Sequence, residues 1–123
     1  MDRDTAILYR ILKYCNWIEK SLERFGDSLE VFKSDVDYRN SVCMNILQIG
    51  ELVGKLSDSF LESTKDEIPW KEIRAVRNIV AHAYSTVNDK IIFEAAHSDV
   101  KELKEFCEAQ IEKSDDEDDE QSH

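Results

Sequence analysis

Three side chains near the middle of this 123-residue chain have types and spacing suited to chemistry on a phosphodiester. They are Arg77, His82 and Tyr84. Arginine carries a fixed positive charge on a fork of donors that matches phosphate oxygens, and histidine takes and gives a proton near neutral pH. The sequence offers no competing cluster and no Gly-rich phosphate loop, and His82, His97 and His123 lack the spacing of a zinc site. We therefore expect no metal and no cofactor.

The helix that carries these residues limits how they can meet. Arg77 and His82 lie about 140° apart around an ideal helix, so one helix does not direct both side chains to one point. Either the long Arg77 side chain swings round, or the helix ends at His82, or two copies of the chain combine their residues in one cleft. Asn78 shares a face with His82 and could orient the imidazole or a bound phosphate.

A symmetric cleft of this kind would suit RNA. One His82 would take the proton of a ribose 2′-hydroxyl, Arg77 would hold the phosphate, and the second His82 would protonate the leaving 5′-oxygen. A plainer interpretation exists, because a histidine at a helix C-terminus is often a favourable cap, and the arginine could be a surface residue beside an acid. Spacing alone leaves both interpretations open.

Apolar residues recur at steps of three and four along four segments, which predicts four helices. They run from about residue 5 to 25, with Asp4 as the N-cap, from about 37 to 56 and on toward Phe60, from 69 or 70 to 82, and from 88 or 89 to 113. A single helical turn is expected over 29–33. No strand period occurs, so the predicted fold is all-α: an antiparallel four-helix bundle with a short extra helical connection.

Two glycines interrupt the second predicted helix. A glycine inside a helix costs about 1 kcal/mol relative to alanine, so Gly50 and Gly54 indicate that something packs closely on them. Either a neighbouring helix of the same chain or a second copy of the protein would serve.

The charge distribution divides the chain into two parts. Residues 1–113 are predicted to form one helical domain, and residues 114–123, with the acidic run 115–120, a disordered tail. The formal net charge is −11, and an acidic protein is a poor binder of nucleic acid unless its basic residues are concentrated locally or come from a partner.

The remaining composition bears on location. The three cysteines lie among apolar residues at helical spacing, which predicts buried free thiols. No signal-peptide pattern and no long apolar run occur, so we expect a cytoplasmic protein without membrane contact.

These residues together resemble the HepT-type HEPN toxins. The resemblance rests on the run 68–73, on Arg77-Asn78, His82 and Tyr84, and on the segments 49–51 and 91–103. It covers about residues 4–113. One difference is Ala83, where the family frequently has glycine.

The resemblance implies a homodimer in which paired motifs face a shared cleft, and a metal-independent endoribonuclease that acts as the toxin of a toxin–antitoxin pair. Arg77 and His82 would be catalytic and Asn78 supporting. Tyr84 would be the residue that an MntA-type nucleotidyltransferase antitoxin adenylylates. The alternative is a non-catalytic HEPN subunit that binds a nucleotidyltransferase, which a cleft ringed by carboxylates would favour.

Overall fold

The computed structural model describes residues 1–84, 86 and 88–121, with side chains described through residue 116. Every regular element in these ranges is helical, which confirms the all-α prediction. The elements in chain order are α1 (Arg3–Phe25), α2 (Leu29–Ser34), α3 (Val36–Val53), α4 (Asp58–Thr64), α5 (Trp70–Ala83), α6 (Asp89–Glu94), the π-helical turn η1 (Ala95–Asp99) and α7 (Val100–Gln121). None of the described helices is long and apolar enough to cross a membrane.

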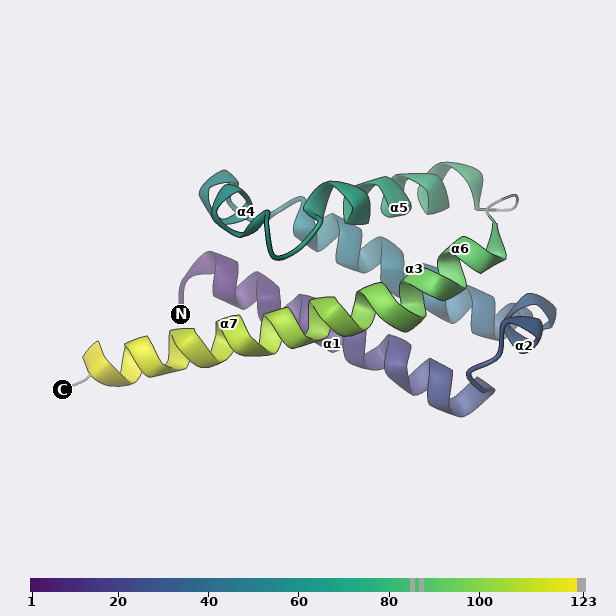
Figure 1. The fold of residues 1–123 in the computed structure, drawn as a ribbon, viewed down its shortest axis with the longest axis horizontal. Helices are drawn as coiled ribbons and strands as arrows, with labels where there is room; N and C mark the ends of the chain where they lie inside the picture. Colours follow the sequence, from purple (N-terminus) through teal and green to yellow (C-terminus); the bar gives the residue numbers. More distant parts are fainter. Residues whose placement is uncertain (85, 87, 122–123) are drawn as a thin grey trace.

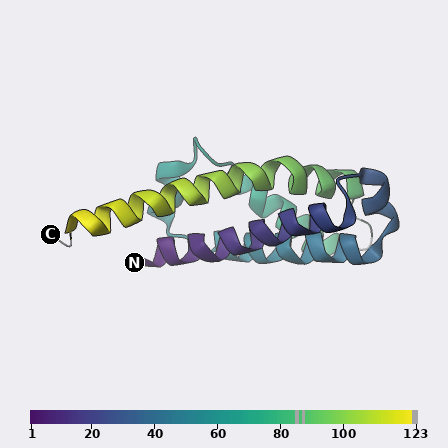
Figure 2. The same ribbon diagram turned by 90° about the horizontal axis from the view of Figure 1, so that it is seen from below.

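The long helices lie side by side along the molecule. Helix α1 packs against α3 and α7, and α5 packs against α3, so α3 lies between α1 and α5. In Figure 1, α5 and α1 lie toward opposite edges of the molecule, and in Figure 2, α1 runs between α3 and α7. The three segments α6, η1 and α7 follow one another almost without a break. The short helix α2 closes one end of the molecule.

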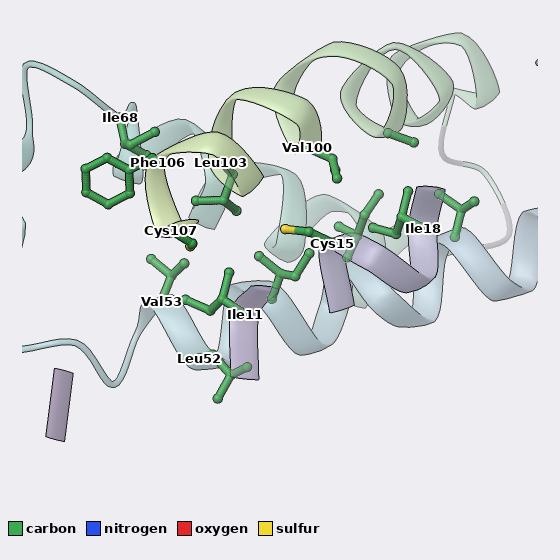
Figure 3. Close-up of a cluster of buried hydrophobic side chains, with 14 of the residues drawn as sticks. Ile11, Cys15, Ile18, Leu52, Val53, Ile68, Val100, Leu103, Phe106 and Cys107 are labelled. Atoms are coloured by element: carbon green, nitrogen blue, oxygen red, sulfur yellow. The ribbon is translucent and has the colours of Figure 1, made fainter. Parts of the chain in front are cut away.

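The core forms where the apolar stripes of α1, α3 and α7 meet. Figure 3 shows side chains from these helices directed into one cluster. Five apolar residues of the last predicted helical segment are all buried, namely Ile92, Ala96, Leu103, Phe106 and Cys107. Aliphatic burial of this kind contributes about 25 cal/mol per Å² of apolar surface removed from water. The recurrence of apolar residues at steps of three and four therefore predicted correctly which side of this segment faces the core.

The three cysteines are free and buried, as predicted. Burial raises the pKa of Cys107 to about 12 and raises the pKa of Cys15 still further from its usual value. Because the thiolate is the reactive form, these thiols are chemically inert parts of the core.

Helix α1 begins earlier than predicted, and its N-cap is Asp2. The Asp2 carboxylate accepts a hydrogen bond from the Thr5 backbone N–H at 2.7 Å. The expected cap, Asp4, instead accepts hydrogen bonds from the backbone N–H and the hydroxyl of Ser57, at 2.8 and 2.6 Å. The prediction of Asp4 as the cap was wrong because this carboxylate joins α1 to the start of α4.

The second long helix is shorter than predicted and ends at Val53. Gly54 is its C-cap, and Ser57 then caps α4 by accepting a hydrogen bond from the Phe60 backbone N–H at 3.2 Å. A capping serine three residues before Phe60 starts a new helix in place of extending the old one.

The last helix extends beyond the predicted boundary at residue 113. Helix α7 continues to Gln121, which differs from the disordered tail expected from residue 114. Ile111 is still buried, and Ser114 accepts a hydrogen bond from the Thr5 hydroxyl at 3.5 Å. Adding residues to an established helix costs little compared with starting one. The described residues do not include 122–123, at the end of the predicted tail. They also do not include Ser85 and Val87, which lie between two of the predicted helices.

Candidate functional site

The helix that carries the predicted motif is held in place at its start. Pro69 precedes α5, and the flanking Ile68 and Trp70 are buried. The Trp70 indole N–H donates to the Thr64 hydroxyl at 2.9 Å and its ring packs edge-on against Phe106 at 5.6 Å. These contacts join the start of α5 to α4 and α7, while Val80 anchors its far end in the core.

Arg77 is half-buried and directed toward α3. Its guanidinium forms an ion pair with Glu51 and donates from Nη1 to the Asn78 side-chain oxygen at 3.0 Å. Its Nε is buried without a hydrogen-bond partner among the described residues. The stem of the side chain is therefore enclosed, and only the Nη end can reach a ligand. Asn78, which the sequence predicted to share a face with His82, thus contacts Arg77.

The two glycines of α3 make room for arginines of α5. A side chain at Gly50 would collide with Cβ and Cγ of Arg77, and one at Gly54 would meet the guanidinium of Arg74. Arg74 also donates to the Gly50 carbonyl at 2.7 Å. Of the two alternatives that the sequence left open, the neighbouring helix of the same chain accounts for this close approach.

We expect Gly50→Ala to lower the free energy of unfolding by about 1–3 kcal/mol, because its new methyl group would overlap the rigid base of the Arg77 side chain and force α3 and α5 apart. Gly54→Ala is the matched control. Its methyl group would meet only the movable end of Arg74, and the backbone of Gly54 has dihedral angles that alanine adopts without strain, so stability should be unchanged or higher by up to about 1 kcal/mol. Urea denaturation measures both, and equal effects would contradict the packing explanation.

His82 lies on the exposed side of the last turn of α5. Helix α5 continues to Ala83, and Tyr84 still has helical dihedral angles, so the angular separation from Arg77 is that of a regular helix. No hydrogen bond or ion pair among the described residues connects His82 to Arg77 or Asn78. Within one chain, the structure thus brings Arg77 and Asn78 into contact, but it does not bring His82 into contact with them.

Tyr84 is held by Arg39 of α3, a residue that sequence reasoning missed. The Arg39 guanidinium lies 4.7 Å from the centre of the tyrosine ring and donates to the Tyr84 carbonyl at 2.5 Å. Asp89 at the start of α6 accepts from Arg39 at 2.7 Å, and this hydrogen bond raises the pKa of Arg39 above its usual value. Arg39 therefore fixes the end of α5 to two other helices, while Tyr84 as a residue remains 39% exposed.

The charges near the motif are mixed. Arg39 forms an ion pair with Asp89 and Arg77 forms one with Glu51, whereas Arg74 donates to a backbone carbonyl. Of these carboxylates, Glu51 pairs with Arg77 of the motif and is a competitor for any phosphate that approaches this arginine.

An apolar pocket lies between α3, α5, η1 and α7, and no residue of the motif lines it. It is lined by aliphatic side chains together with Glu72, Asp99 and Glu102. Burial, followed by the neighbouring carboxylates, raises the pKa of Asp99. A shallower hollow between α3 and α5 adjoins the motif and is lined by Asn40, Met44, Leu47, Val80, Ala81 and Tyr84. The described residues contain no group of three metal-ligating side chains.

Comparison with known proteins adds a family match. A family model described as "Ribonuclease HepT-like" matches residues 11–110. The chain is 32% identical over 97 residues to "Putative RNase TTE0752" of Caldanaerobacter subterraneus subsp. tengcongensis, covering 79% of this chain and 84% of the relative. It is 27% identical over 96 residues to "Putative RNase MJ1380" of Methanocaldococcus jannaschii, covering 71% of this chain and 86% of the relative. No solved structure matches significantly.

Proposed function

Because this chain belongs to the HepT-like ribonuclease family, we propose that it is a metal-independent endoribonuclease and the toxin of a toxin–antitoxin pair. The observation that carries the proposal is the placement of Arg77. Its stem is enclosed against Gly50, and its Nη atoms form the accessible end of the side chain, where they contact Asn78 and Glu51. A guanidinium held this way is pre-organised for a phosphate. With RNA as the substrate, a cytoplasmic location is part of the proposal.

The reaction begins with neutral His82, which removes the proton of a ribose 2′-hydroxyl. The 2′-oxygen attacks the adjacent phosphorus, and the bond to the 5′-oxygen breaks. A second, protonated histidine donates to that leaving oxygen. Arg77 binds the non-bridging oxygens, whose negative charge grows in the transition state. The products are a 2′,3′-cyclic phosphate and a 5′-hydroxyl.

The second histidine comes from a second copy of the chain, so the proposal includes a homodimer of HEPN-type four-helix bundles. The separation of Arg77 and His82 within one chain supports this arrangement, as do exposed apolar side chains beside the motif. Met44 is 57% and Ile79 45% exposed. Sedimentation of a chain of 14.3 kDa should give a species of twice that mass at tens of micromolar, and a monomer at that concentration would leave the reaction without its acid.

The alternative is a non-catalytic HEPN subunit that binds a nucleotidyltransferase. Its specific support is the ion pair between Arg77 and Glu51, which would be kept intact in a protein that never binds phosphate. In the proposed ribonuclease, the substrate phosphate either binds Arg77 together with Glu51 or displaces Glu51 from it.

A substrate lacking one hydroxyl tests the proposal directly. The purified protein with excess EDTA should cleave an RNA and leave a 2′,3′-cyclic phosphate. A 2′-deoxy nucleotide at the cleavage position should abolish that cut, because it removes the attacking oxygen. Continued cleavage at the deoxy position would exclude the reaction above. No cleavage of any RNA by the purified dimer would favour the binding subunit.

Tyr84 is the proposed site of regulation. We expect an MntA-type nucleotidyltransferase with ATP to add AMP to the Tyr84 hydroxyl, with release of pyrophosphate, and to stop cleavage, since a bulky anion beside the motif repels substrate phosphate. Intact mass spectrometry should find one AMP per chain, and Tyr84→Phe should take up none. Modification of the Phe variant to the same extent would assign the reaction to another residue.

A further inference from the structure

One helix of this acidic protein carries a concentrated basic surface. The chain has a formal net charge of −11, but α1 contains five basic and only three acidic residues. Steps of three and four residues connect a set of exposed side chains along it, namely Arg10, Lys13, Trp17, Lys20 and Arg24. Such spacing places a set of residues on one side of a helix. We call this set the α1 basic face.

The α1 basic face is free of other described elements. The opposite side of α1 supplies Ile11, Cys15 and Ile18 to the core, as Figure 3 shows. The neighbours of the helix are α3 and α7, and in Figure 2 its outer side is not crossed by another helix. The cations on it therefore project into solvent.

Two aromatic side chains of α1, Tyr14 and Trp17, lie beside these basic residues. Trp17 is 46% exposed, and its ring meets that of Tyr14 edge-on with centres 5.3 Å apart. The Lys13 ammonium lies 4.8 Å from the Tyr14 ring centre and 5.2 Å from that of Trp17. An exposed indole held beside an ammonium can stack on a base while the ammonium binds the adjoining phosphate.

The acidic residues of α1 do not cancel this charge. Asp4 is engaged by Ser57, and Glu19 is paired with Lys104 of α7 at 2.6 Å. The third acid, Glu23, lies on the flank of the helix. By contrast, no ion pair in the described part of the chain involves Arg10, Lys13, Lys20 or Arg24. These four remain available for an anionic ligand.

We propose that the α1 basic face binds single-stranded RNA, with Lys13 and Lys20 on phosphates and Trp17 stacked on a base. RNA as the ligand rests on the proposed function. A membrane surface fits the helix less well, because membrane-bound amphipathic helices insert their apolar side, and the apolar side of α1 is occupied by the core.

This face is separate from the cleavage motif. Helix α3 lies between α1 and α5, so two helix-packing distances of about 8–10 Å each separate their axes. An RNA of only two nucleotides occupies the motif alone, whereas a longer strand also reaches the α1 basic face. Most of the binding energy for long RNA then comes from residues of α1. The scissile phosphodiester is cleaved at the motif on α5.

Binding is tested with a strand of about 20 nucleotides carrying 2′-O-methyl groups, which the proposed reaction cannot cleave. Fluorescence anisotropy of the double variant K13Q/K20Q should give at least tenfold weaker binding at low salt, with the slope of log K against log salt reduced by about 0.7 per lost contact. Trp17→Ala should weaken binding about fivefold or more at every salt concentration. The matched control K33Q/K101Q removes the same charge from exposed sites on α2 and α7 and should bind like the unmodified protein.

Kinetics separate this proposal from the proposed function. K13Q/K20Q should raise KM for a long RNA about tenfold with kcat unchanged, and should cleave a dinucleotide at the normal rate. Unchanged binding and KM in K13Q/K20Q would overturn the proposal while leaving the ribonuclease intact. Loss of RNA binding in K13Q/K20Q, in a protein that cleaves no RNA, would support the face and refute the proposed function. Binding to phosphatidylserine vesicles that depends on Lys13 and Lys20, without RNA binding, would also overturn it.

Discussion

Replacing His82 with alanine is expected to lower kcat for RNA cleavage by about 10²–10⁴-fold, the range for loss of a positioned acid or base. In the proposed dimer both copies lose their imidazole, so the proton donor and the proton acceptor disappear together. His82 is exposed on the last turn of α5, and the variant should therefore unfold at the same urea concentration as the unmodified protein.

The matched control is His97→Ala. His97 is also exposed, and it pairs with Asp27 at 2.8 Å, in a part of the chain that does not carry the motif. Its replacement should leave kcat unchanged. A His82→Ala variant that cleaves RNA at the normal rate would end the proposed mechanism, and equal losses in both variants would indicate a general effect of removing histidine.

Replacing Arg77 with alanine is expected to lower kcat about 10²–10³-fold, because one aimed donor to a developing negative charge is lost. This change also removes packing. The Arg77 stem fills the space above Gly50, and Glu51 loses its partner. The variant should thus be less stable as well as less active, by about 1–3 kcal/mol for a cavity of this kind combined with an unpaired half-exposed acid.

Arg77→Lys separates the two effects. Lysine keeps the positive charge and most of the stem, but it lacks the planar fork that contacts two oxygens at once. We expect near-normal unfolding in urea and a kcat between those of the Ala variant and the unmodified protein. Full activity of Arg77→Lys would show that charge alone is sufficient, and normal activity of Arg77→Ala would remove Arg77 from the reaction.

The fold was predictable where apolar periodicity is strong. The apolar stripes of α1 and of the segment that forms α6, η1 and α7 were predicted from their spacing, because a helix must bury such a stripe. The ends of helices were less predictable. Asp2 and Asp4 are both good caps, and only the contact of Asp4 with Ser57, about fifty positions away, decides between them. The sequence around a helix end does not show whether a distant residue will contact it in the folded chain.

The candidate site was predictable in its residue types and only partly in its partners. Arg77, Asn78 and His82 follow one another on a single helix, so their spacing is visible in the sequence. Glu51 and Arg39 come from α3 and meet α5 only after the chain folds back. Gly50 did give a signal, since a glycine inside a helix required an explanation, but its partner depended on which helix packed there.

The close fit between Gly50 and Arg77 also affects how the protein can lose its activity during growth. If RNA cleavage arrests cells, mutations that inactivate the chain will be selected. Substitutions at position 82 should yield full-length inactive protein that accumulates normally, whereas most substitutions at position 77 should disturb the α3–α5 interface and be cleared by cellular proteases. Survivors altered at the arginine should therefore contain less of the protein than survivors altered at the histidine.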